Sequence, residues 1–207
     1  PVLRVFALAV VLTGACSSRT SATSGQPAVR DTSLRAELLQ RMSADEAVRG
    51  RLATAQRESE QPDSALIARV GDVDGENTRW LAETVARRGW PGRSIVGTDG
   101  ADAAFLLIQH ADADTAFQAR VLPLLAQAYR AGEASGQQLA LLTDRVATAR
   151  GAPQVYGTQL SLVAGRAVLK PMIDSAGVDA RRATVGLPPL REYLRLIDSA
   201  YTSHSRH

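Results

Sequence analysis

Apolar residues recur at helical spacing through most of the chain, and the period changes only near its end. Leu34, Leu38 and Met42 lie at i, i+4 and i+8, which places them on one stripe of a helix. Comparable apolar faces follow in the segments at 78–89, 101–111, 115–132 and 135–151. The pattern predicts a compact, mainly α-helical fold of several helices.

Short polar signatures predict where some of these helices begin. In a capping box, Ser or Thr pairs with Glu or Gln three residues later and satisfies free N–H groups at a helix start. Three such pairs occur, at Ser43–Glu46, Thr115–Gln118 and Ser135–Gln138. Pro123 predicts a kink or a late helix start, and Gly89 predicts a helix end. Residues 59–77 contain a proline and two glycines, and they predict a loop with a short turn.

After residue 151 the pattern favours β structure. Residues 154–172, "QVYGTQLSLVAGRAVLKPM", are rich in β-branched and aromatic residues around "AG", which predicts a hairpin turning near Ala164 and Gly165. If the first residues form a strand, Gln154, Tyr156 and Thr158 lie on one of its faces. Two closing helices and a disordered tail are expected at 178–186, 190–201 and 202–207.

The N-terminus has the pattern of an export signal. A basic residue, an apolar run at 5–12 and small residues precede Cys16, and we expect a signal peptide at 1–15. The stretch resembles a bacterial lipoprotein signal, in which Cys16 becomes the lipid-modified first residue, although Thr13 stands where leucine is usual. The alternative is an ordinary signal peptide cut nearby. Residues 16–32 are small and polar and predict a flexible tether.

Composition limits the class of protein. With 207 residues and 45% hydrophobic content, the chain can bury one sizeable core, so we expect a single domain at 33–201. Aromatics are only 4%, which favours packed helices over a β sandwich. The 24 basic residues, of which only Lys170 is lysine, are interleaved with 21 acids, so nucleic-acid binding is not expected. Cys16 is the only cysteine, and no cofactor or metal site is predicted.

His110 is the only histidine before the last four residues. As a general base it would be oriented by Asp112 or Asp144. Alternatively it closes the C-terminal turn of a helix, is buried with a hydrogen-bond partner, or contacts a ligand. No serine lies in a nucleophile-elbow motif and no HExxH spacing occurs, so neither a serine triad nor a zinc site is supported.

An acidic run resembles a calcium-binding loop. Its acids occupy the first, third, fifth and twelfth places of an EF-hand, at Asp72, Asp74, Glu76 and Glu83. The sixth place, which needs glycine for a sharp turn, is Asn77. We therefore interpret the run as an acid-rich helix N-terminus rather than a calcium site.

Polar residues around the predicted hairpin are candidates for ligand binding. Arg145 could bind a carboxylate or phosphate through its planar fork, or form a structural salt bridge. Gly157 within a strand indicates a bulge or a close backbone approach. The predicted site for a neutral polar ligand, such as a peptide or sugar, comprises Gln109, His110, Arg145, Gln154, Tyr156, Thr158 and Gln159. The alternative is that these amides satisfy backbone groups at the junction between helix and hairpin.

Several motifs occur together in one order: GWPG, VG, QHAD, LTDR, YGTQ and GLPPLREYL. This combination resembles the bacterial domain-of-unknown-function 6624 family, over roughly residues 34–196. The matching positions are Trp90, Pro91, Gln109, His110, Asp112, Asp144, Arg145, Tyr156, Thr158 and Gln159. The resemblance implies a compact, mainly helical bacterial domain and brings no activity with it.

Three hypotheses about function follow. The first is an exported lipoprotein, anchored to a membrane of the cell envelope through Cys16, that acts as a non-catalytic ligand-binding or envelope-interaction module. The second is a hydrolase-like enzyme with His110 as its general base. The third is that the polar groups only hold the fold together. Because no nucleophile or metal-ligand motif is recognisable, the first is favoured over the second.

Overall fold

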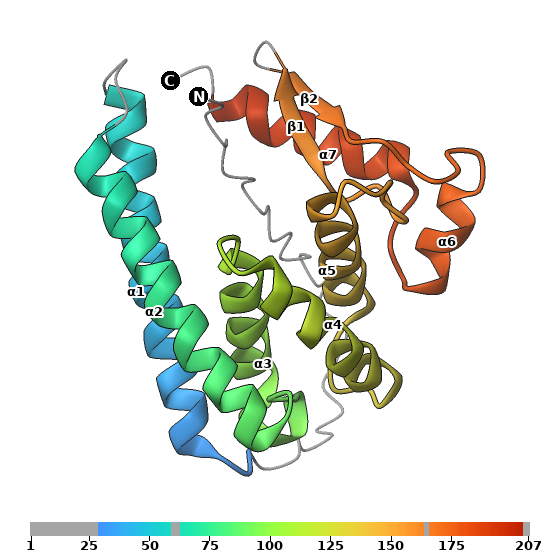
Figure 1. Cartoon of the computed structure of the whole chain (residues 1–207). Coiled ribbons are helices and arrows are strands. Elements are labelled where there is room, and N and C mark those ends of the chain that lie inside the picture. Colours follow the sequence, from blue (N-terminus) through green and yellow to red (C-terminus); the bar gives the residue numbers. More distant parts are fainter. Residues whose placement is uncertain (1–28, 59–62, 164–165, 205–207) are drawn as a thin grey trace, which may run out of the picture. The chain divides into compact units, whose positions relative to one another are not determined.

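The computed structural model describes residues 29–58, 63–163 and 166–204 (Figure 1). The predicted signal peptide and the tether up to residue 28 lie outside the described residues. The chain divides into two compact units, an N-terminal unit at Pro27–Leu142 and a C-terminal unit that contains Thr143–His207. Each unit is described separately below. Most described residues are helical, as the apolar periodicity predicts.

The N-terminal unit is built from helices. They are α1 (Thr32–Glu58), α2 (Ser64–Arg88), α3 (Arg93–His110), α4 (Thr115–Arg130) and the first half of α5 (Gly136–Ala149). Helices α1, α2 and α3 all contact one another, and α1 and α2 run side by side along their length (Figure 1). No helix among the described residues is long and apolar enough to cross a membrane.

Helix α1 is continuous, so the helix start expected at Ser43 is wrong. The segment has no proline, and Ala, Leu, Arg and Glu favour helix throughout. The true start is set by Asp31, whose Oδ1 accepts the N–H of Leu34 at 2.8 Å. Ser43 is exposed in the middle of the helix and makes no cap there.

Helix α2 includes most of the segment expected to be a loop. Asp63 caps its start by accepting the N–H groups of Ala65 and Leu66 at 2.9 and 3.1 Å. The acidic run at 72–83 therefore lies inside the helix, not at its N-terminus. An apolar face packs the helix against α1, and this burial outweighs the low helix propensity of its two glycines, about 1 kcal/mol each. The buried residues of that contact are Val48, Leu52, Val70 and Val73.

The local signals at Gly89 and Ser135 mark helix boundaries as expected, whereas the one at Thr115 does not act as expected. Helix α2 ends at Gly89, and Ser135 and Gln138 form a reciprocal capping box at the start of α5, with bonds of 2.9 and 3.1 Å. Helix α4 begins at Thr115 but is capped by Asp114, which accepts the N–H of Phe117 at 2.8 Å. The capping box expected from Thr115 and Gln118 does not form, because Gln118 donates to the carbonyl of Ile108 instead.

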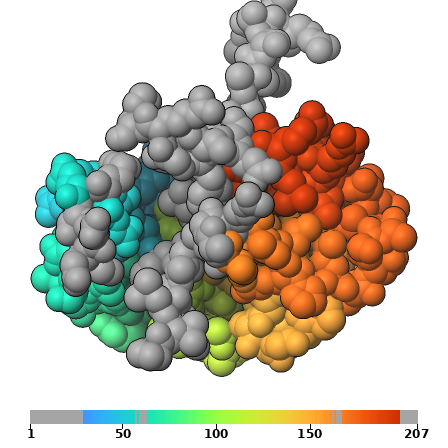
Figure 2. Space-filling model, turned by 90° about the horizontal axis from the view of Figure 1, so that it is seen from above, coloured from blue at the N-terminus to red at the C-terminus, as the bar shows by residue number. Residues whose placement is uncertain are grey.

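The C-terminal unit combines helices with one hairpin. It contains the second half of α5, β1 (Leu160–Val163), β2 (Arg166–Leu169), α6 (Val178–Thr184) and α7 (Leu190–His204). The strands pair antiparallel, with Leu160 opposite Leu169, so the predicted hairpin is confirmed. The expected turn at 164–165 lies outside the described residues. In the space-filling view the orange surface of the hairpin region adjoins the red surface of α7 (Figure 2).

Residues 154–159 do not form a strand. Gln154 makes one isolated bridge with Met172, and the strand begins only at Leu160. Gly157 adopts a φ of 71°, and an added Cβ would lie 3.0 Å from side-chain atoms of Met172 and Leu190. The close backbone approach expected at this glycine is confirmed, and the segment is an irregular turn instead of a strand face.

Candidate functional site

Four charged or titratable side chains from three helices meet inside the N-terminal unit. Asp45 and Arg49 lie one turn apart on α1, Asp74 lies on α2, and His110 is the last residue of α3. We refer to these four residues as the three-helix cluster. Neighbours at i and i+4 lie on one helix face, which explains why Asp45 and Arg49 can both point toward the other two helices.

Hydrogen bonds connect all four members of the cluster. Asp45 uses both oxygens: Oδ2 accepts from Nδ1 of His110 at 2.8 Å, and Oδ1 accepts from Nε of Arg49 at 3.0 Å. Nη2 of Arg49 also donates to Oδ1 of Asp74 at 2.5 Å. The guanidinium thus joins the two carboxylates through the Oδ1 atom of each.

Burial and charge separate the acidities of the two carboxylates. Burial raises the pKa of Asp45, but the hydrogen bond and charge of His110, with the charge of Arg49, outweigh it and hold that pKa below its usual value. Burial raises the pKa of Asp74 to about 6 against the opposing charge of Arg49. Asp45 is fully buried, whereas the side chains of Asp74 and His110 are each 15% exposed. The cluster is therefore reachable from solvent through Asp74 and His110.

The donor set of this cluster suits two kinds of chemistry. Asp45, Asp74 and His110 each offer one ligand atom, and these atoms all lie within 4.8 Å of one another, so together they could hold a metal ion. Alternatively, a carboxylate that accepts from Nδ1 of a histidine orients the ring for proton transfer at its Nε2. Both possibilities use the same three side chains.

Two buried amides close to the cluster in sequence each have one atom without a hydrogen-bond partner among the described residues. These atoms are Nδ2 of Asn77, which lies one turn from Asp74 on α2, and Oε1 of Gln118. The other end of each amide is used: Oδ1 of Asn77 accepts from Arg41 at 3.2 Å, and Nε2 of Gln118 donates to the carbonyl of Ile108 at 3.0 Å. An unpaired buried polar atom destabilises a fold by about 1–3 kcal/mol, so it is usually kept for a reason other than stability.

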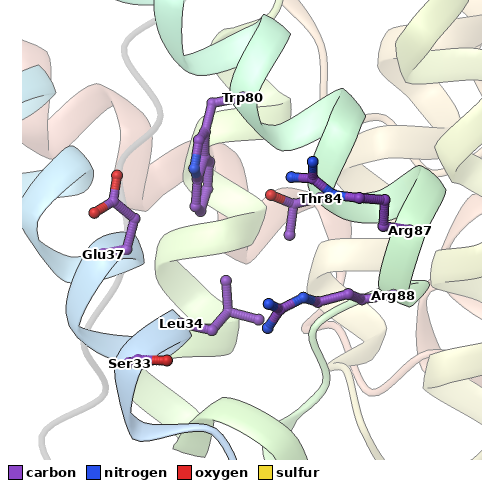
Figure 3. Close-up of a pocket in the computed structure, with 7 residues that line it drawn as sticks. All are labelled: Ser33, Leu34, Glu37, Trp80, Thr84, Arg87 and Arg88. Carbon is purple, nitrogen blue, oxygen red and sulfur yellow. The ribbon is translucent and has the colours of Figure 1, made fainter.

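Residues of α1 and α2 also line a groove away from the cluster. The guanidinium of Arg41 lies 4.4 Å from the ring centroid of Trp80 and bonds Glu37 on its other side. Glu37 and Trp80 line this groove, a cavity of about 190 Å³, together with Ser33, Leu34, Thr84, Arg87 and Arg88 (Figure 3). Because Glu37 and Asp45 are two turns apart, the groove and the cluster are separated by about 12 Å along α1.

The aspartates expected to orient His110 have other positions. Asp112 is exposed in the turn after α3, and the bond to His110 is made by Asp45 of α1. Asp144 belongs to the C-terminal unit, where its buried carboxylate accepts the backbone N–H groups of Val155 and Thr158 at 2.7 and 2.9 Å. The residue that contacts Nδ1 of His110 is Asp45, which lies 65 positions earlier in the chain and is not among the partners expected from the sequence.

Asp144 instead holds the irregular turn at 154–159. Besides the two N–H groups above, it accepts the N–H of Tyr156 at 3.0 Å and the hydroxyl of Thr158 at 2.9 Å. Gln154 is fully buried; its Nε2 donates to the carbonyls of Gln159 and Lys170, and its Oε1 accepts the N–H of Gln159 at 2.8 Å. These side chains satisfy backbone groups, which agrees with the structural alternative for the amides of this segment.

The remaining predicted ligand-binding residues divide between the two units. Gln109 is buried beside His110 in the N-terminal unit, whereas Tyr156 and Arg145 are half-buried in the C-terminal unit. The carbonyl of Tyr156 accepts from the buried guanidinium of Arg182 at 2.7 Å. Within the described residues, Gln109 and His110 lie in one unit and Arg145 and the 154–159 segment in the other.

Sequence reasoning identifies His110 but misses its partners. The available signals are weak: an Asp–Arg pair at i and i+4 is common on exposed helix surfaces, and Asp74 lies in a run whose pattern is typical of a helix start. Asp45 has no local feature that distinguishes it from its exposed neighbour Glu46. Only the packing of α1 against α3 brings Asp45 to His110.

The fold and cluster define a mainly α-helical domain with a partly exposed site of two carboxylates, an arginine and a histidine. The chain matches the model of a family of unknown function, DUF6624, over residues 32–206, and it belongs to that family. No curated protein and no solved structure matches the chain.

Proposed function

We propose that this chain is an exported lipoprotein whose N-terminal unit binds a small polar ligand at the three-helix cluster. One observation carries the proposal. Oppositely charged side chains from three helices meet at a point where the side chains of Asp74 and His110 are partly exposed to solvent. Hydrogen-bonding and charged groups that converge on one partly open point are typical of polar binding sites.

Energetics support binding over a purely structural role. A buried network of charges is often less stabilising than apolar side chains of the same volume. Asp74 has its pKa raised to about 6, so its ionised form is disfavoured in the folded chain. The unpaired amide atoms of Asn77 and Gln118 add to this energetic disadvantage. Groups retained at such a disadvantage are typical of functional sites.

The binding proposal is tested on the chain from residue 17 onward, purified without the signal peptide and Cys16. A screen of amino acids, short peptides, sugars and carboxylates by thermal shift identifies a ligand, and calorimetry measures its affinity. We expect Asp74→Asn and His110→Gln to weaken binding at least tenfold, whereas Glu46→Gln, an exposed neighbour on α1, leaves it unchanged. Equal affinity in all variants would place the ligand elsewhere.

The export proposal rests on the N-terminal sequence. A basic residue, an apolar run and small residues lead to the only cysteine, Cys16. We expect the chain, expressed in a bacterium together with its N-terminal segment, to incorporate labelled palmitate and to fractionate with membranes. Cys16→Ser removes the label and releases the chain from the membrane. Palmitate labelling that persists in Cys16→Ser would contradict a lipid anchor at this residue.

A hydrolase-like function with His110 as general base is the second candidate. It is favoured by the bond between Oδ2 of Asp45 and Nδ1 of His110, which fixes the ring and leaves Nε2 as the proton acceptor. A panel of ester and amide substrates tests it, with His110→Ala expected to abolish turnover. Turnover unchanged by this substitution would exclude His110 as the base.

A further inference from the structure

We infer that the three-helix cluster holds a divalent transition-metal ion, with Asp45, Asp74 and His110 as its protein ligands. This inference rests on the proposed binding function and names the class of ligand. The three side chains come from α1, α2 and α3, and their ligand atoms lie within 4.8 Å of one another. Bonds of about 2.0–2.2 Å to a common ion place ligand atoms roughly 3–4 Å apart, so small side-chain rotations complete the site.

The types of donor select the class of ion. An imidazole nitrogen suits zinc and neighbouring transition metals, whereas calcium and magnesium prefer oxygen ligands alone. Two carboxylates and one histidine supply three protein ligands, the number found in zinc sites that keep a further position open. Because the side chains of Asp74 and His110 are each 15% exposed, that position can be reached by a small molecule.

Arg49 has the role of an outer-shell residue in this arrangement. It bonds Oδ1 of Asp45 and Oδ1 of Asp74, which fixes both carboxylates and leaves their Oδ2 atoms for the ion. Ligating carboxylates in metal sites are commonly held by such hydrogen bonds. Two carboxylates and one guanidinium leave a net charge of about −1 for a divalent ion, so the site is electrostatically favourable.

We place the ion between His110 and Asp45. Nδ1 of His110 and Oδ2 of Asp45 lie 2.8 Å apart, at hydrogen-bond distance. A bound metal ion would take the place of this hydrogen bond, because coordination requires an unprotonated ring nitrogen. Asp45 is fully buried, so the ion would lie at the base of the cluster with solvent only on the side of Asp74 and His110.

Calorimetric titration with Zn²⁺ tests the site. The chain carries two further histidines near its end, so the background variant is His204→Gln with His207→Gln, prepared metal-free from residue 17 onward. We expect one Zn²⁺ per chain and a melting temperature that rises with Zn²⁺ concentration. Asp74→Asn and His110→Gln, chosen as isosteric or near-isosteric, reduce the affinity at least tenfold, and Glu46→Gln does not.

A spectroscopic readout separates metal coordination from a merely structural role. Co²⁺ bound by one nitrogen and two carboxylates gives visible d–d absorption that His110→Gln changes, whereas a structural role would leave no such band. Failure to bind either ion in the background variant would overturn the metal site. If a polar ligand still binds and depends on Asp74, the proposed binding function survives that failure. If neither ion binding nor the binding of any polar ligand depends on these residues, both proposals fail.

Discussion

Asp45 is fully buried and bonds two residues of the three-helix cluster, His110 and Arg49. We expect Asp45→Ala to lower the free energy of unfolding by about 3 kcal/mol, because it breaks the ion pair with Arg49 and the hydrogen bond with His110 at a fully buried position. Urea denaturation measures the loss. Glu46→Gln, on the same helix but exposed, is the control and changes stability by less than about 0.5 kcal/mol. A loss as small as the control's would show that the contacts of Asp45 contribute little to the free energy of unfolding.

In the C-terminal unit, Asp144 is likewise a fully buried carboxylate that accepts several hydrogen bonds. Its carboxylate accepts three backbone N–H groups and the hydroxyl of Thr158. An asparagine side chain at this position would turn its NH₂ group toward some of these donors, so we expect Asp144→Asn to lower the unfolding free energy by about 2–3 kcal/mol. Thr158→Val removes only the hydroxyl and is expected to have a smaller effect, about 1 kcal/mol. The reverse order in chemical denaturation would contradict this role for Asp144.

Residue-level prediction succeeds for the structural interpretation of the amides and fails for partners distant in sequence. In one of the two interpretations the amides near the hairpin satisfy loose backbone groups, and the side chain of Gln154 does so by bonding the backbone N–H and carbonyl of Gln159. A local pattern offers only neighbours such as Asp112 as partners for His110. Asp45 approaches through the packing of two helices, which no local pattern encodes.

At the scale of the element, α3 carries two aspartates with opposite effects on stability. The hydrogen bond and charge of Arg35 hold the pKa of Asp99 below its usual value. Burial raises the pKa of Asp102, although Arg93 and Gln138 oppose it. The first carboxylate is stabilised as its ion and the second is disfavoured as its ion.

These shifts predict pH dependences of opposite sign. A lowered pKa contributes stability above the usual aspartate value of 3.8, and this stability is lost as the pH falls through the folded-state pKa. A raised pKa has the reverse effect: stability is fully present below 3.8 and declines as the pH rises through the folded-state pKa. Asp99→Asn should therefore lower the melting temperature at pH 7, and Asp102→Asn should raise it.

Melting curves between pH 3 and 7 check this pair. Both differences from the parent chain should shrink toward the acid end of the range, where protonation of the aspartates increases in the folded and unfolded states alike. A destabilised Asp102→Asn variant at pH 7 would contradict this expectation. It would mean that the hydrogen bond from Nε2 of Gln138, 2.8 Å long, stabilises the ionised Asp102 by more than burial destabilises it.

Helix boundaries show where a local sequence signal sets the start of a helix and where tertiary contacts override it. The capping box at Ser135 forms with Gln138 in the reciprocal arrangement that the local signature predicts. The similar signature at Thr115 fails because Gln118 is drawn into the core, toward the carbonyl of Ile108. Helix α2 persists through two glycines because its apolar face is buried against α1. Local propensity therefore sets the boundary only where tertiary contacts leave the residue undisturbed.

At the scale of the whole molecule, Asp45 and Asp144 belong to different compact units. All described bonds of Asp45 lie within Pro27–Leu142, and all those of Asp144 lie within the unit that contains Thr143–His207. Hydrogen exchange is expected to report each loss locally. Asp45→Ala should speed amide exchange most in α1 and α3, and Asp144→Asn most in residues 154–172. Equal acceleration in both units for either variant would indicate a single cooperative unit.

The sequence alone determined the class of fold, most helices, the late hairpin and the family resemblance, because these depend on apolar periodicity, turn residues and short motifs that act locally. Only the tertiary structure decided that Asp45, Arg49 and Asp74 join His110, because three helices must pack before these side chains meet. It likewise showed that Asp144 and Gln154 hold the backbone of an irregular turn. Contacts between residues distant in the chain depend on how apolar faces pack, and a helical pattern specifies that a face is buried without specifying its partner.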